Sequence, residues 1–148
     1  MGNWYVIVLL LFSTQFCYAL AEPLSEKDMR AQVTQFITLN DSIDKQSTIV
    51  RLSQLTATQF EYYQPSFQIH LNKEQWVNAL NERMKQTRTR NVKTEIIHIE
   101  FALNAAFVKQ KSTWQQRVNG KWYARSSDNI VSLFEFSNGE IIAVREYW

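Results

Sequence analysis

The chain is poor in cysteine, glycine and proline. Its 148 residues include one cysteine, three glycines and two prolines. The cysteine, Cys17, lies within the first 21 residues, so the sequence after them can form no disulfide and its core must rely on packing. Three glycines do not supply a glycine-rich phosphate loop. The two histidines, His70 and His98, lack the spacing of metal ligands. We therefore expect no disulfide, no metal and no cofactor.

An excess of charge of one sign is also missing. The chain has 16 Lys and Arg residues against 14 Asp and Glu residues. This balance does not favour a nucleic-acid partner. The length suits one domain, and the 45% apolar content is ordinary for a globular chain. One basic segment, residues 83–93, is explained by the solvated end of a helix, with an anionic partner or a membrane surface as the alternative.

The first 21 residues contain no charged side chain. Residues 4–12 are a continuous apolar run, and Ala19-Leu20-Ala21 has the small-x-small form of a cleavage site. The pattern predicts a secretory signal peptide over residues 1–21 and one domain over residues 22–148. The run is shorter than the roughly 20 residues of a spanning helix, although a retained anchor is the alternative. We expect an exported protein, periplasmic or secreted, with no stable membrane span after cleavage.

Three segments have helical periodicity. The helices are predicted over residues 25–40, from residue 44 towards 55, and from residue 73 onwards, with Ser25 and Asn72 as N-caps. A short strand is predicted over residues 66–70, because Pro65 forbids a helix there. The apolar stripes of the first and third helices are Met29, Val33, Phe36 and Ile37, and Trp76, Val77, Leu80 and Met84.

The pattern becomes extended after residue 91. Alternation over residues 94–103 places Ile97, Ile99 and Phe101 on one face of a strand. Asn119-Gly120 and Asn138-Gly139 each lie between alternating runs, which is the strongest short-range hairpin signal. The sequence therefore predicts an α+β fold, with three N-terminal helices packed on a curved antiparallel sheet.

The two-residue loops also predict which residues pair across each hairpin. In the first hairpin Trp114 is predicted to face Arg125. In the second, Ser132 is predicted to face Arg145, which leaves Glu146 on the other face, where exposure is the simpler interpretation. Neither face of the last hairpin is plainly polar, so both need cover. We expect the helices on one face and a second subunit on the other, which makes a homodimer through the sheet.

The closing segment carries a family resemblance. Phe134-x-Phe136 followed by Asn138-Gly139-Glu140-Ile141 resembles the SnoaL-like branch of the nuclear transport factor 2-like superfamily, and residues 61–80 are similar to the stretch that leads into its third helix. The resemblance implies a cone-shaped fold that encloses a pocket. It also implies a range of functions: isomerases, dehydratases, polyketide cyclases, and binding or dimerisation domains without catalysis. The cyclases tend to keep an acid on the final strand, at positions that would fall beyond Trp148.

We therefore expect binding of an apolar or aromatic small molecule without catalysis. An isomerase-, cyclase- or dehydratase-like enzyme is the first alternative, with a pocket His or Asp as general base and His70 as the best residue for it. Asp128, in a polar segment, is better explained as a turn residue. A sheet-mediated homodimeric assembly module is the second alternative. The predicted ligand-binding residues are Tyr63, Phe67, Trp76, Ser132, Phe134, Arg145 and Tyr147.

Overall fold

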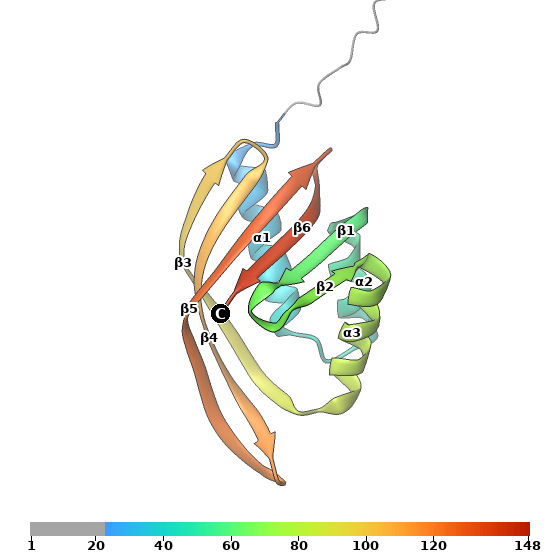
Figure 1. Cartoon of the computed structure of the whole chain (residues 1–148), viewed down its shortest axis with the longest axis vertical. Coiled ribbons are helices and arrows are strands. Elements are labelled where there is room, and N and C mark those ends of the chain that lie inside the picture. Colours follow the sequence, from blue (N-terminus) through green and yellow to red (C-terminus); the bar gives the residue numbers. More distant parts are fainter. Residues whose placement is uncertain (1–22) are drawn as a thin grey trace, which may run out of the picture.

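A computed structural model of the chain describes residues 23–148 (Figure 1). These residues form three α-helices, a short 3₁₀ helix and one six-stranded sheet. The predicted signal peptide and Cys17 lie outside the described residues. Within residues 23–148, no helix combines the length and the apolar character needed to cross a membrane.

The three predicted helices are present, and two of them begin where the sequence predicts. They are α1 (Glu26–Asp41), α2 (Gln46–Gln54) and α3 (Lys73–Gln86). The Ser25 side chain accepts a hydrogen bond from the Asp28 backbone N–H at 3.2 Å, and Asn72 forms a reciprocal capping box with Gln75. The exception is α2, which starts later than expected; Lys45 stands at its N-cap position and contributes no side-chain cap.

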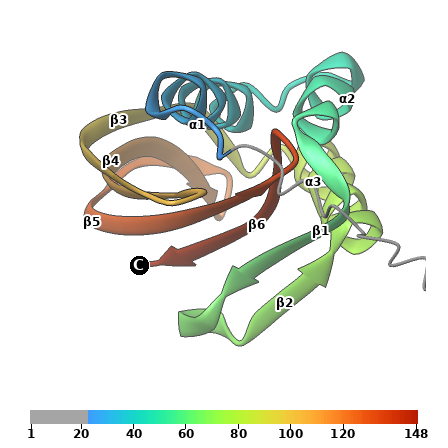
Figure 2. The same cartoon turned by 90° about the horizontal axis from the view of Figure 1, so that it is seen from above.

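The sheet contains both parallel and antiparallel pairs. Its order is β2-β1-β6-β5-β4-β3, in which β1 and β6 are parallel and all other neighbours are antiparallel. Figure 2 shows the three helices gathered on one side of this sheet. The strands are β1 (Thr56–Gln64), β2 (Ile69–Asn72), β3 (Thr89–Ala102), β4 (Ala105–Val118), β5 (Lys121–Ser137) and β6 (Glu140–Tyr147).

The α+β class is confirmed, but the order of elements differs from the prediction. The helices are not all N-terminal to the sheet, because β1 and β2 precede α3. The short strand predicted over residues 66–70 is present but starts later, because Pro65–Phe67 form the 3₁₀ helix and β2 begins at Ile69. Proline suits the first position of such a turn because it has no N–H to leave unbonded. Gln68, at φ 57°, then reverses the chain in the left-handed region.

The alternation predicted for β3 fails at one residue. The pairing of β3 with β4 shifts register between Ile96 and His98, which leaves Ile97 as an extra residue. A bulge of this kind moves the side chains on one side of it to the opposite face. Ile97 is consequently 51% exposed, whereas Ile96 and Ile99 both pack in the core.

The last two hairpins follow the predicted register only in part. In the first, Trp114 faces Arg125 as predicted. In the second, the pairing next to the turn is also as predicted, but a register shift then makes Ile142 an extra residue of β6. Ser132 therefore faces Glu146 instead of Arg145. Since a one-residue slip exchanges the two faces of a strand, Glu146 lies on the helix side of the sheet.

An aromatic cluster joins the helices to the sheet. Phe36 of α1 stacks on Trp76 of α3 with ring centroids 5.8 Å apart, and it meets Phe134 of β5 edge-on at 5.3 Å. Phe60 of β1 contacts Trp76 from another side at 4.7 Å. All four side chains are buried. Pairs with these geometries add to the stabilisation gained by burying their area, and two of the four side chains, Phe36 and Trp76, also line the site described next.

Candidate functional site

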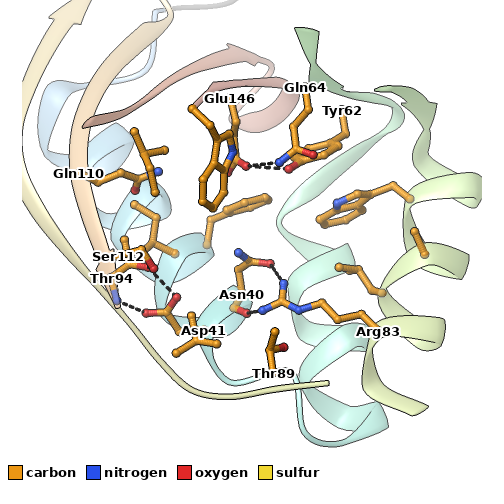
Figure 3. Close-up of a pocket in the computed structure, with 18 of the residues that line it drawn as sticks. Asn40, Asp41, Tyr62, Gln64, Arg83, Thr89, Thr94, Gln110, Ser112 and Glu146 are labelled. Atoms are coloured by element: carbon orange, nitrogen blue, oxygen red, sulfur yellow. Dashed lines mark hydrogen bonds between the residues drawn. The ribbon is translucent and has the colours of Figure 1, made fainter. Parts of the chain in front are cut away.

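A cavity of about 430 Å³ lies between α1, α3 and the sheet (Figure 3). Its volume falls in the range of small-molecule sites, which also combine apolar walls with a few polar groups. The polar groups come from α1, α3, β1, β3, β4 and β6. The apolar walls include Phe36, Ile37, Ile69, Leu71, Trp76, Leu80, Trp114 and Ile130.

A carboxyl group stands at one end of the cavity. Glu146 of β6 is 8% exposed, and its Oε2 accepts hydrogen bonds from the Tyr62 hydroxyl at 2.7 Å and from Gln64 Nε2 at 3.3 Å. The parallel pairing of β1 with β6 sets Tyr62 opposite Val144. Tyr62 and Gln64 are two positions apart and so point to the same face of β1. Two neighbouring strands thus hold this carboxyl in position.

The surroundings of Glu146 favour its protonated form. Burial raises its pKa above the ordinary value, although hydrogen bonds from Tyr62 and Gln64 act in the opposite direction. Burial also raises the pKa of the Tyr62 phenol well above its usual range, and the charge of Glu146 adds to this rise. Tyr62 therefore remains a hydrogen-bond donor, and Glu146 can hold a proton at pH values where an exposed glutamate has lost it.

A guanidinium group stands away from this carboxyl in Figure 3. Arg83 of α3 donates from Nη1 to Asn40 Oδ1 at 3.1 Å and from Nη2 to the Asn40 carbonyl oxygen at 3.2 Å. Burial lowers the pKa of Arg83 from its ordinary value, and the neighbouring Tyr62, Asp41 and Glu146 act in the opposite direction. An arginine stays protonated in spite of such a shift, so the cavity carries a positive charge.

Asp41 also lines the cavity, and its carboxylate is held by β3. The Thr94 backbone N–H donates to Asp41 Oδ2 at 2.6 Å, and the Thr94 hydroxyl donates to Oδ1 at 2.8 Å. The same hydroxyl oxygen lies 3.2 Å from the Ser112 Oγ. Both carboxylate oxygens therefore have partners within the protein.

The Gln110 amide of β4 contributes a further polar group. Its Nε2 donates to the buried Ser132 hydroxyl at 2.8 Å. Its Oε1 is buried and has no hydrogen-bond partner among the residues that the structure describes. A buried acceptor without a partner costs about 1–3 kcal/mol. Gln110 also lines the cavity.

The structure brings only part of the predicted ligand-binding set to this cavity. Trp76 lines it. Ser132 is buried behind Gln110, and Phe134 lies in the core against Phe36. The remaining predicted residues, Tyr63, Phe67, Arg145, Tyr147 and the predicted base His70, are not among those that line the cavity.

Three of those remaining residues meet elsewhere. The His70 ring stacks on Tyr63 with centroids 4.3 Å apart, and the Arg145 guanidinium lies 4.0 Å from the Tyr63 ring centre. His70 Nε2 is 3.3 Å from Glu61 Oε2, and the Tyr63 hydroxyl also donates to this carboxylate. Tyr63 alternates with Tyr62 along β1, so the group lies on the face of the sheet away from the cavity. Phe67, in the 3₁₀ helix, is 60% exposed.

One of the functional groups that the sequence analysis missed had a signal in the sequence. Arg83 follows Trp76 and Leu80 at helical spacing, so it belongs to the stripe of α3 that faces the core. Its basic neighbours in residues 83–93 predict a solvated helix end instead, and for Arg83 this prediction is wrong. Glu146 had no such signal, because its face depends on the extra residue in β6.

Among residues 23–148, no group of three or more His, Cys, Asp or Glu side chains gathers in a way that could hold a metal ion. The polar groups of the cavity are two carboxyls, a phenol, hydroxyls, amides and a guanidinium. These groups can donate and accept hydrogen bonds and move a proton.

No protein-family model and no curated protein matches the sequence. Solved structures do match the fold. A candidate SnoaL-like polyketide cyclase from Shewanella denitrificans has a TM-score of 0.69 at 9% identity, over 83% of this chain and 90% of that one. A similar candidate from Shewanella putrefaciens has 0.65 at 7% identity, over 84% and 90%.

A third similar structure comes from Mycobacterium tuberculosis and is described as a LEH-like epoxide hydrolase. Its TM-score is 0.62 at 14% identity, and the match covers 82% of each chain. Other matching structures are described as ketosteroid isomerase-like or NTF2-like. At these identities the likeness concerns the fold. The chain has the α+β fold of SnoaL-like and nuclear transport factor 2-like proteins.

Proposed function

We propose that this chain binds a small, mostly apolar molecule in the cavity and that Glu146 exchanges a proton with it. The observation that carries the proposal is the buried Glu146 carboxyl at the cavity wall, with its raised pKa and its two donors on β1. A general acid or base works best when its pKa approaches the working pH. Burial of a carboxyl in apolar surroundings is the usual way to achieve this.

Glu146 and the groups around it have different roles in a proton transfer. In its protonated form Glu146 gives a proton to an oxygen of the ligand, and in its ionised form it takes one from a carbon or from water. The hydrogen bonds from Tyr62 and Gln64 stabilise the ionised form. Such a site suits isomerisation, cyclisation or hydrolysis of an apolar substrate, and the fold is shared with candidate cyclases and an epoxide hydrolase.

The test uses turnover and binding together. A panel of enolisable ketones and epoxides is incubated with the protein in deuterated water, and mass spectrometry measures exchange and product. We expect Glu146→Gln to lower the rate by about 10²- to 10⁴-fold, the usual contribution of a general acid or base. Glu135→Gln, a matched change on the other face of the sheet, leaves the rate unchanged. His70→Ala separates this proposal from the hypothesis of a His70 base, because only the latter expects a loss there.

Binding without catalysis is the second proposed function, favoured by the mostly apolar walls of the cavity. It expects ligands to bind wild type and Glu146→Gln with equal affinity and to leave both unchanged. Equal turnover by wild type and Glu146→Gln would contradict the proposed role of the carboxyl.

Export and dimerisation are further proposals. The apolar run and the Ala-x-Ala sequence before residue 22 support export, and N-terminal sequencing of the protein recovered from cells tests cleavage after Ala21. Phe107, Val131 and Tyr147 are large apolar side chains that remain exposed on β4, β5 and β6. They support a dimer through the sheet, which light scattering tests as a mass twice that of one chain.

A further inference from the structure

We infer that the ligand of the cavity is a monocarboxylic acid with an apolar body and that Arg83 binds its carboxylate. The inference deepens the proposed function, since it names the class of molecule that the same cavity takes. It depends on four features: the contacts of Arg83, the state of the nearby acidic groups, the apolar walls and the separation of the two charged ends.

Arg83 lines the cavity with a charge that the protein does not neutralise by direct contact. A guanidinium has five N–H donors, and the described side-chain hydrogen bonds of Arg83 engage two atoms of Asn40, both neutral acceptors. Among residues 23–148, no ion pair within 4.0 Å involves Arg83. Arg83 is partly buried, and a charge that loses part of its hydration gains from a counter-ion. The remaining donors can meet that counter-ion in the cavity.

The nearby acidic groups are poorly suited to this role. Both Asp41 oxygens already accept hydrogen bonds from Thr94. Glu146 is held by Tyr62 and Gln64, and burial favours its neutral form. A ligand carboxylate fits better, because its two oxygens match the planar fork of a guanidinium.

The surroundings of Arg83 favour a ligand with one negative charge over a ligand with two. Asp41 is near enough to influence the charge of Arg83, so its own negative charge opposes a second charge on the ligand. A phosphate carries up to two charges at neutral pH and is less well matched than a carboxylate. Beyond the Arg83 end, the walls are formed by side chains such as Phe36, Trp76 and Leu80, which suit an aliphatic or aromatic body.

The positions of the two polar ends orient the ligand. In Figure 3 the Arg83 and Asn40 pair lies away from the group of Glu146, Tyr62 and Gln64. With its carboxylate at Arg83, a ligand presents the far part of its apolar body to Glu146. The reacting atoms of the substrate are therefore remote from the carboxylate, which serves only for recognition.

The experiment compares acids with their neutral amides. Isothermal titration calorimetry at neutral pH and low salt measures the binding of octanoate, octanamide, phenylbutyrate and phenylbutyramide. We expect wild type to bind each acid about ten- to a hundred-fold tighter than its amide, as a charge-assisted hydrogen-bonded pair predicts. Arg83→Met abolishes this preference and Arg83→Lys retains part of it. The control Arg51→Met, at an exposed position of α2, keeps it whole.

Three outcomes would overturn the inference: equal affinity of wild type for acid and amide, a preference that survives in Arg83→Met, or no binding of any acid in the panel. Circular dichroism checks the fold of each variant. If Arg83→Met fails to fold, the weakened preference expected of Arg83→Lys remains decisive. The same titrations on Glu146→Gln separate the two proposals, because an acid preference that persists there supports Arg83 recognition even where no proton transfer occurs.

Discussion

Replacing Glu146 with glutamine tests the electrostatic description of the cavity through protein stability. Burial raises the pKa of Glu146 in the folded protein. Between the ordinary carboxyl value of about 4.3 and the raised value, the native state therefore binds more protons than the unfolded chain. Under this condition the free energy of unfolding falls as the pH rises. The destabilisation is absent below the ordinary pKa and complete above the raised one.

The free energy of unfolding can fall with pH only as steeply as the titration of one group allows. A difference of one bound proton changes the free energy of unfolding by about 1.4 kcal/mol per pH unit. Glutamine keeps the shape of glutamate and an oxygen that accepts from Tyr62, but it does not titrate. Subtracting the stability of Glu146→Gln from that of wild type therefore cancels the titration of all other groups and isolates Glu146.

Urea denaturation followed by circular dichroism, at a series of pH values from acidic to weakly basic, measures this difference. We expect wild type to lose stability relative to Glu146→Gln as the pH rises above about 4.3, with a slope no steeper than the one-proton limit. The control is Glu135→Gln, on the face of the sheet away from the cavity. This variant loses the ion pair of Glu135 with Arg145 Nε at 2.8 Å, which lowers the free energy of unfolding by up to about 1 kcal/mol. A difference between wild type and Glu146→Gln that stays constant or grows with pH would refute the reasoning.

Other predictions concern the core and the last turn. Trp76→Ala removes the contacts with Phe36 and Phe60 and is expected to lower the free energy of unfolding by about 3–5 kcal/mol in urea denaturation. Trp122→Ala is the matched control: it loses mainly the contact with Arg90, at 4.1 Å, and costs about 1 kcal/mol, so equal losses would contradict the assigned core. Gly139→Ala forces a side chain onto a residue at φ +81° with open space around it. It should cost about 1–2 kcal/mol of backbone strain in thermal unfolding, and a neutral result would contradict the turn geometry.

The sequence predicted the elements whose determinants are local. Ser25 and Asn72 cap helices through contacts with residues three positions away, and Asn119-Gly120 brings Trp114 opposite Arg125. Each of these features depends on the few residues around it. The parallel pairing of β1 with β6 brings Tyr62 beside Val144, and no pattern within either segment indicates the other as its partner.

The site was predicted less well than the fold because its residues depend on those distant contacts. Trp76 was found through the apolar stripe of its helix. Tyr63 was predicted to bind the ligand, but its neighbour Tyr62 is the one that lines the cavity. The sequence of two adjacent tyrosines does not reveal which of them faces inward. Glu146 was expected to be exposed on the final strand, yet its side chain is buried.

The extra residue of β6 decides which side chain enters the cavity. Ile141, Ile142, Ala143 and Val144 are all apolar, so either register buries apolar side chains and the sequence pattern does not choose between them. The difference lies in the polar residues that follow. The regular register would turn Arg145 towards the cavity. Tyr62 and Gln64 donate hydrogen bonds there, and a guanidinium has no acceptor for them. The shifted register brings in Glu146, which accepts both donors, and leaves Arg145 on the outer face with Glu135 and the Tyr63 ring. The bulge at Ile142 is thus the local irregularity that supplies the cavity with its acid, as bulges beside functional sites commonly do.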